Sequence, residues 1–136
     1  MADGIMLSLR ECWFEKILSG EKNVEVRLTW PTQIETPFRA FLYCSGHGES
    51  GGKVGGECVV DRLEYIVAGG EARADTLKAL CLTREELSAY RKGREAYLLY
   101  LRGVQRYDEP MPLRAFRCRG FRMRRPPQSW CYVEEA

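Results

Sequence analysis

The sequence is poor in the residues that catalytic and metal sites most often use. Its 136 residues include a single histidine, His47, and none of its six cysteines forms a Cys-x-x-Cys pair. Structural zinc sites draw on closely spaced cysteine and histidine pairs, so the sequence indicates no metal and no cofactor. A cysteine nucleophile would have to pair His47 with Cys44, and no third group nearby orients that pair. The sequence therefore favours an ordinary loop residue at His47.

Long apolar runs and spacer segments are also lacking. The apolar stretches are short and interrupted by charges, which excludes a transmembrane helix. The first residues, MADGIMLSLRE, carry acidic residues where a signal peptide needs a basic leader. A hydrophobic content of 45% over this length supports one core. We expect a single domain over residues 1–136, cytoplasmic, with no membrane partner and with reduced, mostly buried cysteines.

Acidic residues are absent from residues 110–130, and arginine is abundant there. Six arginines alternate with aromatic residues in this segment: Arg114, Arg117, Arg119, Arg122, Arg124 and Arg125, beside Phe116, Phe121 and Trp130. Guanidinium groups next to aromatic rings suit a polyanion with stackable bases. The pattern predicts that a nucleic acid contacts this segment, with Arg122, Arg124 and Arg125 among the binding residues. The alternative is an ordinary basic segment whose arginines lie on different faces and whose rings belong to the core.

The periodicity of apolar residues predicts an α+β fold. A helix is expected over residues 10–19, with Cys12, Trp13, Ile17 and Leu18 at helical spacing. A second helical region follows the connector AGGEARAD and contains the capping-box pair Thr83 and Glu86. Strands are expected over 5–9, from 24 onward, and over 38–45, 57–66, 96–107 and 130–134, with a turn or short helix at 110–116. This order favours a curved, mostly antiparallel sheet flanked by short helices.

The stretch SGEKNVEVR, residues 19–27, concentrates three charges at the start of a predicted strand. Val24 and Val26 point to one face of that strand, while Glu25 and Arg27 point to the other. Lys22 has the opposite parity to Glu25, but it precedes the regular pleat and its long side chain can swing to the polar side. From the residues alone, the three charges are either a salt-bridged, solvated strand edge or one shared binding or catalytic site.

A glycine-rich segment follows the strand at 38–45. Gly46, Gly48 and Gly51 match the spacing of a dinucleotide-binding loop, but the chain continues as a strand where that site requires a helix. The segment is therefore either a plain solvent loop or a mobile loop that closes over a ligand.

Three sequence features together resemble ASCH domains, which are small proteins of the PUA-like superfamily. Gly20, Lys22, Glu25 and Arg27 occupy every position of the G-x-K-x-x-E-x-R signature of that family. The segment GKVGGECVVDRLEYI is similar to the glycine-led strand of the family, and RRPPQSWCYVEE resembles the ending common in phage and prophage members. These features span residues 5 to 134, so the resemblance covers nearly the whole chain.

The resemblance implies a compact β-barrel flanked by helices, with a ligand cleft beside the signature strand. RNA or a nucleotide-derived small molecule is the implied partner. Lys22 and Arg27 would then meet phosphate or carbonyl oxygens, and Glu25 would accept hydrogen bonds from a base, a sugar or a catalytic water. Glu57 and Asp61 would complete the cleft, with plain surface charge as their alternative. Trp30 would stack on a base, with a core or rim position as its alternative.

The resemblance also implies a second class of function, that of a hydrolase. Some small bacterial ASCH proteins are amidohydrolases of N4-acetylcytidine that use a lysine, a threonine and a glutamate. Lys22 stands at the lysine position, but Glu25 replaces the threonine, which removes the hydroxyl group from that position. Glu86 is the candidate for the glutamate. Other relatives are proposed ribonucleases, in which Lys22 and Glu25 would be the catalytic pair.

Overall fold

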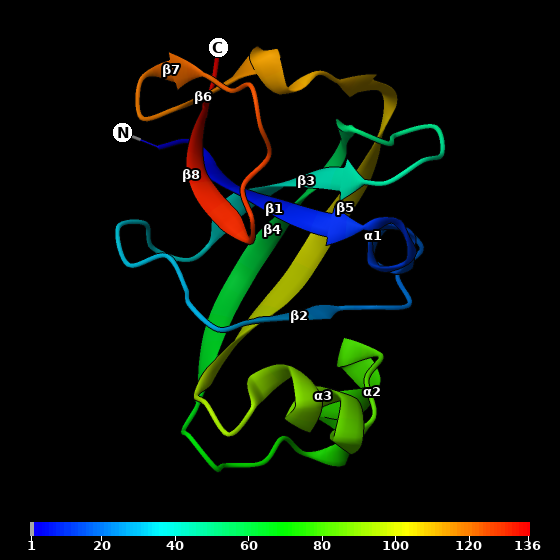
Figure 1. Cartoon of the computed structure of the whole chain (residues 1–136), viewed down its shortest axis with the longest axis vertical. Coiled ribbons are helices and arrows are strands. Elements are labelled where there is room, and N and C mark those ends of the chain that lie inside the picture. The colour runs from blue at the N-terminus through cyan, green and yellow to red at the C-terminus, as the bar shows by residue number, and fades with distance from the viewer. Residues whose placement is uncertain (1) are drawn as a thin grey trace.

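The computed structural model describes residues 2–136, and these residues form a mixed α+β fold on one eight-stranded, mostly antiparallel sheet (Figure 1). The strand order is β2-β5-β4-β3-β1-β8-β6-β7, with β1 and β3 parallel. The strands are β1 Gly4–Arg10, β2 Val24–Arg27, β3 Phe38–Ser45, β4 Lys53–Ile66, β5 Ala96–Met111, β6 Phe116–Cys118, β7 Phe121–Arg122 and β8 Trp130–Glu135. The helices are α1 Glu11–Leu18, α2 Ala74–Leu80, α3 Arg84–Arg91 and the single 3-10 turn η1 Leu113–Ala115. The α+β fold class predicted from the sequence is confirmed.

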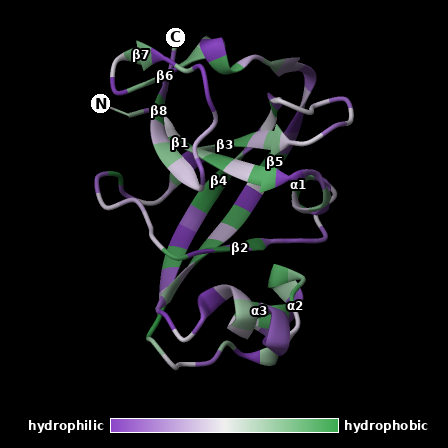
Figure 2. Cartoon of the chain, viewed as in Figure 1, coloured by the Kyte–Doolittle hydropathy of each residue, from purple (hydrophilic) through white to green (hydrophobic). Residues whose placement is uncertain are grey.

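The antiparallel pair of β4 and β5 is the longest in the sheet, and α2 and α3 lie in the connection between the two strands. Figure 2 shows both strands banded in alternating hydrophobic and hydrophilic residues, as expected for a sheet with one buried face. Their pairing slips at several places, for example between Val60 and Arg62 on β4. Such bulges bend a strand and increase its twist. The β4–β5 strand pair is therefore curved, and it reaches from the main sheet to the end of the molecule that carries α2 and α3 (Figure 1).

Helix α1 packs against the main sheet through most of the face that its sequence spacing suggested, because Trp13 and Leu18 pack against the core that contains Ile17. Phe14 and Ile17 are fully buried in the core with residues of β1 and β3, whereas Cys12 is exposed. Gly20, with a φ of 84°, turns the chain back after the helix toward β2. Such positive φ values favour glycine, so this residue of the signature shapes the turn that presents Lys22.

Helices α2 and α3 build a second, smaller core. Thr83 and Glu86 form the capping box expected from the sequence, with the Thr83 hydroxyl accepting from the Glu86 backbone N–H and the Glu86 carboxylate accepting from the Thr83 N–H. Leu80 and Leu87 pack with Val24 of β2 in this core. Strand β2 consequently lies between the main sheet and the helices (Figure 1).

The segment after η1 contains a hairpin that the sequence did not reveal. Strands β6 and β7 are joined by a two-residue turn, and β6 also pairs with β8. With only three and two residues, these strands are too short to show a periodic pattern. The hairpin lies at the opposite end of the molecule from α2 and α3 (Figure 1).

The cysteines are free thiols, but the expectation that most are buried was wrong. Among the six, Cys44 and Cys58 are buried, Cys12 is exposed and the other three are intermediate. Burial raises the pKa of the Cys58 thiol to about 12. Within residues 2–136, three or more metal-ligating side chains do not gather at any point, and every helix is too short or too polar to cross a bilayer.

Candidate functional site

The three charged residues of the signature segment meet at one buried position. Lys22, Glu25 and Arg27 expose only 2%, 7% and 8% of their surfaces. The valines of β2 face the small helical core, so Glu25 and Arg27 on the opposite face point toward the main sheet. The solvated strand edge that the sequence left open is therefore excluded.

Lys22 precedes β2 and reaches the polar side, as its position before the pleat allowed. Its ammonium Nζ lies 3.4 Å from Glu25 Oε1 and donates to the Leu80 carbonyl oxygen at 2.5 Å. The same Nζ lies 5.0 Å from the centre of the Trp13 ring, within cation–π range. A buried ammonium is stable only when it is paired, and Lys22 has a carboxylate, a carbonyl and an aromatic face around it.

Arg27 uses its whole guanidinium group within the protein. Nε and Nη2 donate to Glu25 Oε2 at 3.1 and 2.6 Å, and Nη2 also donates to the Ser8 carbonyl at 2.9 Å. Nη1 donates to the carbonyl and hydroxyl oxygens of Ser129 at 2.9 and 3.2 Å. Because a guanidinium has five N–H donors, these contacts account for all of them.

These contacts place Arg27 across a gap in the sheet. Among the described residues, β2 forms a ladder with β5 alone, whereas Ser8 belongs to β1 and Ser129 directly precedes β8. The guanidinium thus connects the edge strand β2 to the two strands that face it. We call this gap the seam. The curved sheet closes there through a side chain, and not through a backbone ladder.

A pocket of about 480 Å³ opens over the cluster, and we call it the Lys22 pocket. Its walls come from the end of β1, α1, β2, α3 and the residues before β8. The lining residues carry three cations and two carboxylates: Arg10, Lys22 and Arg27 with Glu25 and Glu86. The aromatic rings of Trp13 and Tyr90 also line it. Burial raises the pKa of the Tyr90 hydroxyl, so this side chain is a neutral hydrogen-bond donor at physiological pH.

Several residues expected at the cleft lie elsewhere. Glu57 accepts from the Arg39 guanidinium at 3.1 and 3.2 Å and from the Tyr107 hydroxyl at 3.0 Å, and it is not part of the pocket wall. Trp30 packs on Tyr97, with ring centres 4.4 Å apart, because the chain has left β2 before it reaches this residue.

The arginine segment does not line the Lys22 pocket either. Arg122 donates to the Arg114 carbonyl at 3.0 Å, and Arg124 and Arg125 are exposed on the segment between β7 and β8. The structure thus separates these residues from Lys22, and their contact with RNA stays a prediction.

Other residues of the pocket had no recognisable signal in the sequence. Gln128 and Ser129 line the pocket because the curved sheet brings the start of β8 next to β2. The contact between Ser129 and Arg27 joins residues that are 102 positions apart in the chain. Trp13 was apparent only as an apolar residue of a helix, and Tyr90 only as a residue at the end of α3. Glu86 was proposed from the resemblance, and it does line the pocket.

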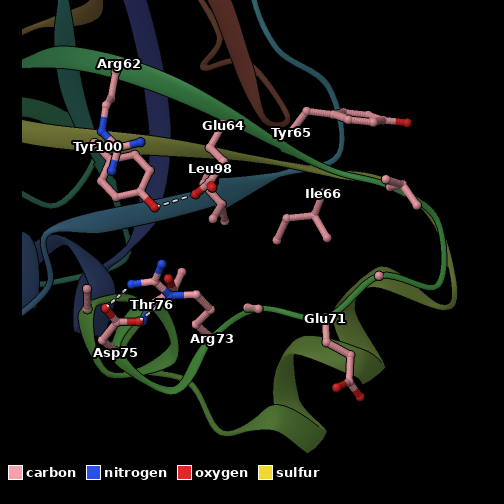
Figure 3. A pocket seen from close by; sticks show the side chains of 14 residues that line it. Arg62, Glu64, Tyr65, Ile66, Glu71, Arg73, Asp75, Thr76, Leu98 and Tyr100 are labelled. Atoms are coloured by element: carbon pink, nitrogen blue, oxygen red, sulfur yellow. Dashed lines mark hydrogen bonds and ion pairs between the residues drawn. The ribbon is translucent and has the colours of Figure 1, made fainter.

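A separate hollow of about 510 Å³ lies between the β4–β5 strand pair and α2 (Figure 3). Its polar side chains are paired with one another: the Tyr100 hydroxyl donates to Glu64 at 2.6 Å, and Arg73 bonds Asp75 at 2.7 Å. Three carboxylates face two guanidinium groups around it. This balance makes it a poorer site for a phosphate than the Lys22 pocket.

No family model matches the chain, and no curated protein matches it. Solved structures of an ASCH protein from Zymomonas mobilis are similar, with 21% sequence identity and a TM-score of 0.73 over 97% of this chain and 88% of that one. A tyrosine-to-phenylalanine variant of that protein gives a TM-score of 0.72 over 97% and 91% of the two chains, and a serine-to-alanine variant gives 0.72 over 98% and 92%. At this identity the likeness shows a shared fold, which agrees with the resemblance to ASCH domains in the sequence.

Proposed function

We propose that the Lys22 pocket binds a nucleotide, either free or as one unit of an RNA chain. The observation that carries the proposal is a buried, paired ammonium at the wall of a pocket that also has two aromatic rings. A volume of about 480 Å³ falls within the usual range for small-molecule sites. Trp13 and Tyr90 offer ring faces to a base, and Lys22 offers a positive charge to a phosphate or carbonyl oxygen.

The hydrogen-bonding capacity of the cluster divides the roles. Lys22 donates one hydrogen bond, to Leu80, and lies 3.4 Å from Glu25 as an ion pair, so its ammonium keeps donor capacity for a ligand. Arg27 has none left. We therefore assign direct binding to Lys22, and we assign to Arg27 the positioning of Glu25, which in turn orients Lys22.

The test is the affinity for uridine monophosphate, measured by calorimetry. A hydrogen bond to a charged group contributes about 1.5–3 kcal/mol, so Lys22→Met should weaken binding by roughly 10- to 150-fold. Methionine has a similar length and leaves Glu25 paired with Arg27, and a thermal melt of the variant checks that it folds. Lys53→Met removes an exposed lysine at the start of β4 and should leave the affinity unchanged. Equal affinities in the two variants would contradict the proposal.

A hydrolase that acts on acylated cytidines or RNA is the second candidate. The contact between Lys22 and Glu25 favours it, because buried acid–base pairs in a pocket are typical of catalytic sites. In amide hydrolysis, Glu25 would take a proton from water as the water oxygen adds to the acyl carbon, the carbon–nitrogen bond would break, and the leaving nitrogen would take a proton from Lys22. Release of acetate from N4-acetylcytidine that disappears in both Lys22→Met and Glu25→Gln would support this activity. Binding of the nucleoside without any product would reject it.

A further inference from the structure

A second groove lies at the other end of the sheet, next to the β6–β7 hairpin. It has a volume of about 840 Å³, and it is walled by β6, the turn that follows it, and β8. We call it the hairpin groove. Two guanidinium groups, Arg117 and Arg119, and two aromatic rings, Trp130 and Tyr132, line it, and the carboxylate of Glu134 lies among them.

The aromatic rings of the hairpin groove are held in fixed positions. The Trp130 indole N–H donates to the Thr29 hydroxyl at 3.0 Å, and its ring meets that of Tyr132 edge to face, with centres 5.1 Å apart. The Tyr132 hydroxyl accepts from the Gln33 backbone N–H at 2.9 Å. Both rings are only partly buried. Fixed, partly exposed rings provide a stacking platform that needs little ordering when a base arrives.

Arg119 occupies a backbone position that arginine rarely takes. The turn between Cys118 and Phe121 consists of Arg119 and Gly120, with φ values of 53° and 82°. Hairpin turns with two positive φ values strongly favour Asn-Gly, because other side chains crowd the left-handed conformation. The hairpin nevertheless places a guanidinium there, at the mouth of the groove.

The two sites are neighbours along the chain. Gln128 and Ser129 line the Lys22 pocket, and the next residue, Trp130, lines the hairpin groove. The two linings therefore meet in sequence at the start of β8. Arginine and aromatic side chains together suit the phosphates and bases of an unpaired strand.

We propose that the hairpin groove binds the nucleotides that adjoin the one in the Lys22 pocket, so that the ligand is a single-stranded oligonucleotide. This inference rests on the proposed function. It assigns phosphate contacts to Arg117 and Arg119 and base stacking to Trp130 and Tyr132.

The test compares uridine monophosphate with an oligouridylate of about eight nucleotides, within the usual length for such sites. The variant Arg117→Gln/Arg119→Asn removes both charges and gives the turn its preferred Asn-Gly sequence. We expect its affinity for the oligomer to fall at least tenfold and the salt slope to decrease by about 1.4, while its affinity for the monophosphate stays within twofold. The control Arg73→Gln/Arg102→Gln removes two charges elsewhere and should leave both affinities unchanged. Lys22→Met should lower the affinity for both the monophosphate and the oligomer.

Tryptophan fluorescence adds an independent readout. In a Trp13→Phe protein, the monophosphate should leave the emission unchanged, whereas the oligomer should quench Trp130 by stacking. If the oligomer and the monophosphate bind with equal affinity, and the Arg117→Gln/Arg119→Asn variant changes neither affinity, the proposed role of the hairpin groove is wrong. The proposed function of the Lys22 pocket would not be affected by that result. Oligomer binding that depends on the hairpin variant but not on Lys22 would support the groove and remove the proposed function of the Lys22 pocket. Binding of neither ligand would overturn both.

Discussion

Replacing Arg27 with alanine should destabilise the protein far more than removing an exposed arginine. The guanidinium is 8% exposed, and its loss would leave Glu25 with Lys22 as its charged partner and would deprive the Ser8 carbonyl of a donor. Removing one partner of a buried ion pair costs about 3–5 kcal/mol. For a chain of 136 residues, the unfolding entropy near the melting temperature is about 0.3 kcal/mol/K, so the melting temperature should fall by about 10–17 °C.

Urea denaturation followed by circular dichroism would measure the loss. Arg102→Ala is the matched control, because its ion pair with Asp61 is 56% and 51% exposed and should contribute less than about 1 kcal/mol. A double variant with Glu25→Gln should cost at least about 1 kcal/mol less than the sum of the single variants, because the two residues share one network. A loss for Arg27→Ala no larger than that for Arg102→Ala would refute the role assigned to the buried cluster.

Three other predictions concern acid, thiols and packing. Burial disfavours the charged form of Glu57, but hydrogen bonds, led by the one from Arg39, outweigh burial and lower the pKa of this carboxyl below the ordinary 4.5. The wild type should therefore be more stable than Glu57→Gln at neutral pH, and the difference should shrink below about pH 4.5. A difference that grew in acid would contradict this assignment. Iodoacetamide at pH 8 should label the exposed Cys12 well before the buried Cys58, whose pKa is about 12, as mass spectrometry of the peptides would show. Gly55→Ala should cost about 1–3 kcal/mol in urea denaturation, because the added carbon would lie 2.5 Å from an aromatic ring of α1, and an unchanged midpoint would show that the ring moves aside.

Local pattern was enough to predict much of the fold. The strand at 38–45 matches β3, and the capping box at Thr83 begins α3, because alternation and capping are properties of neighbouring residues. The helical region was correct in type, but it is two helices, since Cys81 ends α2 in a left-handed conformation. The reason for one glycine of the glycine-rich segment also needed the structure. Gly56 lies so close to the Gln105 carbonyl of β5 that no side chain fits there.

The site was predictable where its residues are close in sequence and not where folding joins distant segments. Lys22, Glu25 and Arg27 lie within one turn and one strand, so reach and parity allowed them to meet, while their burial became known only from the structure. The partners Ser8 and Ser129 belong to strands that meet β2 only because the sheet curves, and no local pattern encodes that curvature. The same reason explains why charge alone could not place the arginine segment relative to Lys22.

The seam also protects an open edge of the sheet. An edge strand with open backbone groups is a template for pairing with another chain, and inward-pointing charges are one protection against it. Strand β2 is such an edge, and it directs Glu25 and Arg27 inward to bonds with the strands that face it. A strand of another molecule could pair with β2 only if the Arg27 guanidinium gave up its buried hydrogen bonds. The cluster that lines the pocket therefore also opposes strand pairing at this edge of the sheet.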